Sequence, residues 1–194
     1  MTCIVGLRHN GILYFGGDSI SVSSYNKTIN RDSKVFKKGS ILFGTCGAPR
    51  MRNLLQHSFQ IPVFSGEDPM SYLVNDFLDA MREHFKEKGF LQKKEEKDVI
   101  DGRILLGLQG ELYQIGSELN INRSRDSYSV LGVGEEYAYG SLHTTEQMPI
   151  EPVQRLQMAL EAAVCYNTDV AGPFTFVTSN DDSTLEEEQT GVFS

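Results

Sequence analysis

The strands expected from this sequence come in adjacent pairs joined by tight turns, and this pairing constrains the fold more than any other feature. Residues 3–8 (CIVGLR) and 12–16 (ILYFG) are short runs rich in β-forming residues. Asn10-Gly11 lies between them and supplies the positive φ angles that a two-residue hairpin turn requires. Residues 34–38 and 40–46 form a second pair of the same kind. Strands paired in this way are antiparallel, which argues against a parallel sheet of alternating strands and helices.

Four helices are expected between and after the strand pairs. Apolar residues at helical spacing predict one helix over residues 50–59 and a second over 69–89, with Asp68 as the N-cap of the second. A third helix is expected to begin near Glu135, and a fourth follows Pro152. Further strands are expected in residues 103–117, 127–134 and 173–179.

This order of elements predicts an α+β fold in which two antiparallel sheets lie between helical layers, a four-layer αββα sandwich. We find no long repeat or linker, so residues 1–194 are expected to form one domain. The charge-rich segment 91–101 is interpreted as a solvated connection, and the acidic tail at about 181–194 as loosely held.

Charge and cysteine usage exclude several classes of partner. The formal net charge of -8 repels phosphate backbones, and the basic residues are dispersed, so nucleic-acid binding is not expected. No apolar run is long enough for a membrane span, and no secretion leader is recognisable. The three cysteines, Cys3, Cys46 and Cys165, form no CxxC pair and suit a reducing compartment. We therefore expect a soluble cytoplasmic protein without a membrane partner.

No motif calls for a metal or an organic cofactor. The four histidines have no spacing typical of a metal site or of a catalytic triad, and none is assigned a role.

Thr2 is the most informative single residue, because it follows the initiator Met1 at the head of the first strand. A threonine hydroxyl becomes a nucleophile when a base lies beside it, and the α-amine of an N-terminal threonine can act as that base. Removal of Met1 would create this arrangement. Cys3 is an alternative nucleophile, but it would need the loss of two residues, and strand alternation favours its burial in the core.

At this point the sequence resembles the proteasome β-subunit and its simpler bacterial ring-peptidase relatives, which are N-terminal nucleophile (Ntn) hydrolases. The resemblance runs nearly from end to end, and its strength lies in the order and spacing of several motifs. These are Thr2, Gly16-Gly17-Asp18-Ser19, Lys34 after Asn30-Arg31-Asp32-Ser33, the turn 44–48, the segment 132–138 and the helix at 160–163.

The resemblance implies a role for each matching residue. Thr2 would be the nucleophile once Met1 is removed, and Lys34 would stabilise the developing alkoxide. Asp18 would orient and neutralise Lys34. The backbone N–H of Gly47 or Ala48 would donate to the oxyanion of the intermediate.

The resemblance also implies a pocket residue and shows two departures. Cys46 falls where relatives place a side chain at the base of the substrate pocket, although simple burial explains it as well. Val133 stands where many active relatives have a serine near the nucleophile, and valine supplies no hydroxyl. The family's aspartate before the last strand corresponds to the segment 166–170 of this sequence, where Asn167 or Asp169 would take its place.

Three functional hypotheses follow from the resemblance. The first is a threonine-type peptidase in a homo-oligomeric ring that acts on peptides or unfolded proteins, with any ATPase regulator a separate chain. The second is a catalytically inactive assembly subunit, which the departures at Val133 and Asn167 allow. The third is an amidohydrolase that acts on small amides.

Overall fold

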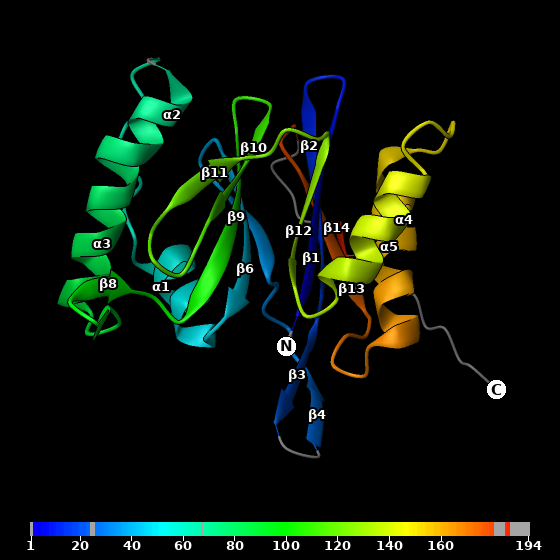
Figure 1. The fold of residues 1–194 in the computed structure, drawn as a ribbon, viewed down its shortest axis with the longest axis horizontal. Helices are drawn as coiled ribbons and strands as arrows, with labels where there is room; N and C mark the ends of the chain where they lie inside the picture. Colours follow the sequence, from blue (N-terminus) through cyan, green and yellow to red (C-terminus); the bar gives the residue numbers. More distant parts are fainter. Residues whose placement is uncertain (1, 24–25, 67, 181–184, 187–194) are drawn as a thin grey trace.

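The two main sheets lie face to face between two groups of helices (Figure 1). The computed structural model describes residues 2–23, 26–66, 68–180 and 185–186. Helices α1 to α3 cover the outer face of one sheet, and α4 and α5 cover the outer face of the other (Figure 1). The expected four-layer αββα arrangement is confirmed.

The first sheet contains the N-terminal strand in an inner position and has the order β12-β1-β2-β13-β14, with all neighbours antiparallel. Asn10 and Gly11 have φ angles of 50° and 77°, as the expected hairpin between the first two strands requires. The strands are β1 (Cys3–His9), β2 (Ile12–Asp18), β12 (Tyr128–Gly132), β13 (Phe174–Thr178) and β14 (Leu185–Glu186).

The second sheet has the order β11-β10-β9-β6-β5 and is also antiparallel throughout. Its strands are β5 (Val35–Lys38), β6 (Ile41–Gly47), β9 (Gly102–Leu108), β10 (Glu111–Ile115) and β11 (Ile121–Arg123).

The helices form where apolar spacing predicts them. Asp68 caps the second helical segment by accepting a hydrogen bond from the Ser71 N–H at 2.9 Å. That segment contains one π-helical stretch but runs without a break in the chain. The helices are α1 (Pro49–His57), α2 (Pro69–Tyr72), the π-helical η1 (Leu73–Phe77), α3 (Leu78–Glu87), α4 (Glu135–Thr144) and α5 (Pro152–Tyr166). In the described part of the chain, none of them has the length and apolar character that crossing a membrane requires.

Three buried clusters hold the four layers together. A phenylalanine-rich cluster packs α1 to α3 on the second sheet, and a mainly aliphatic cluster that includes Tyr128 and Phe176 packs α4 and α5 on the first. The third cluster lies between the two sheets and includes Ile4, Phe15, Leu42, Leu105 and Leu131. It fixes the position of β1 and β2 relative to β5 and β6.

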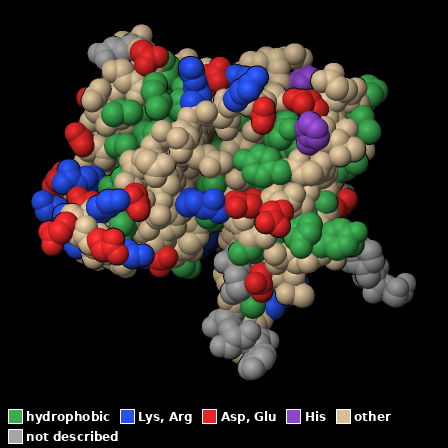
Figure 2. All heavy atoms as spheres, viewed as in Figure 1, with side chains coloured by type: hydrophobic (Ala, Val, Ile, Leu, Met, Phe, Trp, Pro, Cys, Tyr) green, Lys and Arg blue, Asp and Glu red, His purple; other side chains and the backbone are tan. Residues whose placement is uncertain are grey.

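Residues 92–97 are exposed, as expected of a solvated segment, but the expectation of a connection without strands over 91–101 is wrong. This segment contains a hairpin of β7 (Gln92–Lys94) and β8 (Lys97–Val99). Asp98 holds the hairpin to α3, because it accepts from Arg82 Nε at 2.6 Å. Within the hairpin it also pairs with Lys93 Nζ at 2.7 Å. Figure 2 shows acidic and basic side chains mixed over this part of the surface.

A second hairpin was not anticipated. It consists of β3 (Ile20–Ser23) and β4 (Asn26–Ile29) and extends below the two sheets, close to the N-terminus (Figure 1). The expected loose tail, 181–194, lies outside the described residues apart from β14, which pairs with β13.

The cluster between the sheets generates a stability prediction. Phe15 is fully buried there, so Phe15→Ala should lower the free energy of unfolding by about 3–5 kcal/mol through lost burial and a new cavity. Val63→Ala is the control, since Val63 is 90% exposed and its change should stay within about 0.5 kcal/mol. Denaturant unfolding of both variants measures the difference, and equal effects would contradict the assigned core.

Candidate active site

Thr2 is held at the start of β1 by the turn that follows β12. Thr2 is only 4% exposed, and its carbonyl accepts a hydrogen bond from the Val133 N–H at 2.8 Å. Gly132 permits this approach, because it has φ of 114° and a Cβ at that position would collide with the Thr2 carbonyl oxygen. The turn 132–134 therefore positions the main chain of the predicted nucleophile.

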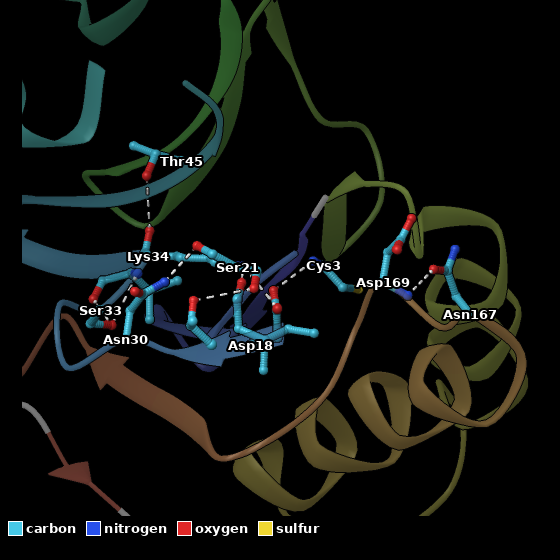
Figure 3. Close-up of polar contacts among 12 residues, drawn as sticks. Cys3, Asp18, Ser21, Asn30, Ser33, Lys34, Thr45, Asn167 and Asp169 are labelled. Atoms are coloured by element: carbon cyan, nitrogen blue, oxygen red, sulfur yellow. Dashed lines mark hydrogen bonds and ion pairs between the residues drawn. The ribbon is translucent and has the colours of Figure 1, made fainter. Parts of the chain in front are cut away.

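Asp18 and Lys34 form an ion pair in the interior beside β1. The Lys34 Nζ lies 2.8 Å from Asp18 Oδ2, and it also donates to the Ile20 carbonyl at 2.6 Å. The other carboxylate oxygen of Asp18 accepts from the Cys3 N–H at 2.8 Å. Asp18 and Lys34 are 1% and 6% exposed, and Figure 3 shows Asp18 between Lys34 and Cys3. The ion pair is thus tied to the residue next to Thr2.

The strand register explains this arrangement. β1 and β2 pair antiparallel with Ile4 opposite Gly17, so the end of β2 lies beside the start of β1. Lys34 directly precedes β5 of the other sheet, and it reaches Asp18 across the end of the interface between the two sheets. Burial raises the pKa of the Asp18 carboxyl, while the charge and hydrogen bond of Lys34 and the N–H of Cys3 lower it.

A cavity of about 300 Å³ opens at this point. Five of the predicted site residues line it, namely Thr2, Lys34, Cys46, Gly47 and Ala48. The other residues that line it are Ser21, Val22, Thr45, Pro49 and Arg52. The structure therefore brings the predicted nucleophile, the lysine and the predicted oxyanion turn to one cavity.

The two predicted oxyanion donors differ in their surroundings. The Ala48 N–H donates to the Asp101 carbonyl at 2.9 Å, so this donor is engaged in the fold. Gly47 is the last residue of β6 and lies opposite Gly102 of β9. Of the two residues, we therefore retain Gly47 as the candidate donor.

Asn167 and Asp169 lie on the other side of the site from Lys34 (Figure 3). Asn167 Nδ2 donates to the Val133 carbonyl at 2.9 Å, and its Oδ1 accepts from the Asp169 N–H at 2.9 Å. Neither residue lines the cavity. Asn167 instead anchors the turn 132–134 through the Val133 carbonyl, while the Val133 N–H of the same turn donates to the Thr2 carbonyl.

Neither the protein-family models nor the curated protein sequences give a match. Solved structures do match over nearly the whole chain. BPH from Thiobacillus denitrificans, solved in complex with epoxomicin, has a TM-score of 0.79 at 14% identity, covering 91% of this chain and 97% of that chain. HslV from Trypanosoma brucei has a TM-score of 0.68 at 13% identity, with coverages of 91% and 98%. The helical Anbu complex from Pseudomonas aeruginosa has a TM-score of 0.64 at 18% identity, with coverages of 97% and 88%.

The chain has the proteasome-like Ntn-hydrolase fold. This confirms the resemblance inferred from the order of motifs in the sequence. At these identities the likeness concerns the fold, and the chemistry has to be argued from the residues of this chain.

Four residues that line the cavity of this proteasome-like fold were not anticipated from the sequence, namely Ser21, Val22, Pro49 and Arg52. Ser21 and Val22 belong to the unanticipated hairpin β3–β4. Arg52 lies in the first turn of α1, where a cation is unfavourable because it faces the positive end of the helix dipole. That local conflict is shared by Arg50, which is exposed and does not line the cavity, so it does not single out Arg52.

The cysteines of the proteasome-like fold occupy different environments. Cys3 is fully buried, and burial raises the pKa of its thiol to about 12. Cys46 is half-buried at the cavity, and burial also raises the pKa of its thiol. Cys165 is exposed. Among the described residues, no group of three or more His, Cys, Asp or Glu side chains is arranged to hold a metal ion.

These environments predict an order of thiol reactivity. Brief treatment of the folded protein with iodoacetamide at mildly alkaline pH should alkylate Cys165 first, Cys46 more slowly and Cys3 only after unfolding, since the thiolate is the reactive form. Peptide mapping by mass spectrometry measures the order. Alkylation of Cys3 as fast as Cys165 would restore Cys3 as a rival nucleophile.

Proposed function

We propose that this chain is a threonine-type peptidase, with Thr2 as the nucleophile after removal of Met1. The observation that carries the proposal is the placement of Thr2 and Lys34 on the wall of one cavity, with Lys34 paired to the buried Asp18. A buried ion pair is seldom more stable than apolar packing of the same volume. Its presence beside a cavity is better explained by chemistry than by stability.

The reaction uses groups of the chain alone. The Thr2 hydroxyl transfers its proton to the Thr2 α-amine, and its oxygen forms a bond to the substrate carbonyl carbon. The oxyanion accepts a hydrogen bond from the Gly47 N–H. The carbon–nitrogen bond then breaks, the ammonium proton passes to the leaving amine, and an ester remains on Thr2. Water hydrolyses this ester with the same amine as base, and the proton returns to the threonine oxygen.

Lys34 and Asp18 prepare the nucleophile electrostatically. A cation near the Thr2 amine disfavours protonation of that amine, which keeps the base ready, and it stabilises negative charge on the threonine oxygen. Asp18 fixes the position of the Lys34 ammonium through the 2.8 Å contact and is itself held by Cys3. We expect no cofactor to be needed.

The main alternative is an inactive assembly subunit, and Val133 favours it. Val133 contributes its N–H to Thr2 and its carbonyl to Asn167, so the turn keeps a structural role without a side-chain hydroxyl. An amidohydrolase that acts on small amides would use the same residues and differ only in substrate.

We further propose that the chain works as a homo-oligomer, with any ATPase regulator a separate chain. Tyr137 and Tyr166 stack with ring centroids 5.5 Å apart, and together with Val133 they expose apolar surface near the site. Figure 2 shows hydrophobic side chains gathered in this region. The Anbu complex from Pseudomonas aeruginosa is a helical assembly, and this supports oligomerisation for a chain of the same fold.

The nucleophile is tested by substitution of Thr2 in protein that has lost Met1. Thr2→Ala should lower kcat/KM for a fluorogenic peptide by at least about 10³-fold, because the attacking oxygen is gone. Thr2→Ser keeps a hydroxyl beside the amine and should retain hydrolysis. Unchanged hydrolysis by Thr2→Ala would refute the proposal, provided that circular dichroism shows the same fold.

The ion pair is tested by a double substitution that separates stability from catalysis. Lys34→Met should lower the free energy of unfolding by about 3–5 kcal/mol, because it leaves the Asp18 carboxylate buried without a counter-ion. Adding Asp18→Asn should restore most of that stability and none of the hydrolysis. A double variant that hydrolyses peptide at the original rate would show that the pair is only structural.

A further inference from the structure

Arg52 places a second cation on the wall of the cavity. It lies in the first turn of α1, is 8% exposed and lines the cavity together with Thr2 and Lys34. The sequence resemblance assigned it no role.

The guanidinium of Arg52 is poorly satisfied by the protein. Its Nη1 donates to the Asp32 carbonyl at 3.3 Å, and its Nη2 lies 3.8 Å from the carboxylate of Asp32, whose side chain is 70% exposed. The Arg52 Nε is buried and has no hydrogen-bond partner among the described residues. A buried donor without a partner costs stability, and the two Nη atoms, which have only long contacts to Asp32, are the donors that remain for a ligand.

The electric field in the cavity favours an anion. Arg52 and Lys34 both line it, and because Asp18 neutralises Lys34, Arg52 supplies the excess positive charge. The N-terminus of α1 at Pro49 adds the positive end of a helix dipole, and none of the described lining residues is acidic. Burial lowers the pKa of Arg52, which reflects the cost of keeping its charge there. This cationic wall contrasts with the formal net charge of -8 of the whole chain.

We infer that Arg52 binds a carboxylate of the substrate, so that the cavity selects peptides with a Glu or Asp side chain beside the cleaved amide bond. The inference rests on the proposed function, because it takes the cavity as the place where substrate meets Thr2. A guanidinium binds a carboxylate through paired N–H groups, which gives both affinity and orientation. The bound side chain would hold the neighbouring carbonyl carbon against Thr2.

The test measures binding to the assembled protein that carries Thr2→Ala, so that turnover does not enter. Three short acetylated peptides differ only in charge: one has a central Glu and an amidated C-terminus, one a central Gln and an amidated C-terminus, and one a central Gln and a terminal carboxylate. The Glu peptide should bind roughly 10- to 100-fold more tightly than the amidated Gln peptide. Equal affinities for all three would overturn the inference, and preference for the terminal carboxylate alone would overturn the side-chain assignment.

Two variants with opposite expected effects identify the residue. Arg52→Met should abolish the preference for the Glu peptide while keeping the bulk of the side chain. Asp32→Asn removes an exposed carboxylate that competes for Arg52, so it should increase the preference by up to about fivefold without a change in the core. If neither Asp32→Asn nor Arg52→Met changes the preference for the Glu peptide, the substrate carboxylate binds elsewhere and the inference is wrong. If Arg52→Met does not fold, an unchanged preference in Asp32→Asn alone contradicts the inference.

The binding experiment is independent of the proposed chemistry. A Glu preference in Thr2→Ala protein, combined with no hydrolysis by the unsubstituted chain, would refute the peptidase and leave the carboxylate site standing. Hydrolysis of peptides without any preference for Glu would refute the carboxylate site and leave the peptidase standing.

Discussion

The buried ion pair between Asp18 and Lys34 is the interaction on which the geometry of the site depends. Two charges removed from water are costly, so both must be satisfied by well-placed partners. Asp18 is satisfied by Lys34 and by the Cys3 N–H, and Lys34 also by the Ile20 carbonyl. These contacts require that the end of β2 lies beside the start of β1. They also require that Lys34, the residue before β5, lies within hydrogen-bonding distance of Asp18 and of the Ile20 carbonyl. The same requirement fixes Thr2, which directly precedes Cys3.

Two further features complete the environment of Thr2. On one side, the turn 132–134 holds the Thr2 carbonyl and is itself fastened by Asn167. On the other side lies a cavity with two cations and, among its described residues, no acid. Asn167 acts through the main chain of Val133 and is therefore a positioning residue. Val133 takes part in this network through its main chain alone, so the network needs no hydroxyl on that side chain.

The sequence predicted the elements whose signals are local and strong. The Asn10-Gly11 turn, the Asp68 cap and the apolar helix faces are each determined by neighbouring residues, and each formed where expected. The hairpin β7–β8 was missed because it is charged and lies on the surface, where ion pairs to Asp98 replace apolar alternation. The hairpin β3–β4 was missed as well, and with it Ser21 and Val22 of the cavity. Arg52 lines the same cavity as Thr2 only because α1 packs against the sheets, and no local sequence pattern predicts that packing.

The central claim is that Thr2 forms a covalent ester with its substrate, and trapping of that ester tests it most directly. The chain would be mixed with a peptide substrate, quenched in acid during turnover and cleaved with trypsin, and the N-terminal fragment would be sequenced by mass spectrometry. We expect the fragment of residues 2–8, without Met1, to carry the acyl group of the substrate on Thr2. Hydrolysis with Met1 still attached, or an acyl group found on Cys3, Cys46 or any other residue, would contradict the account.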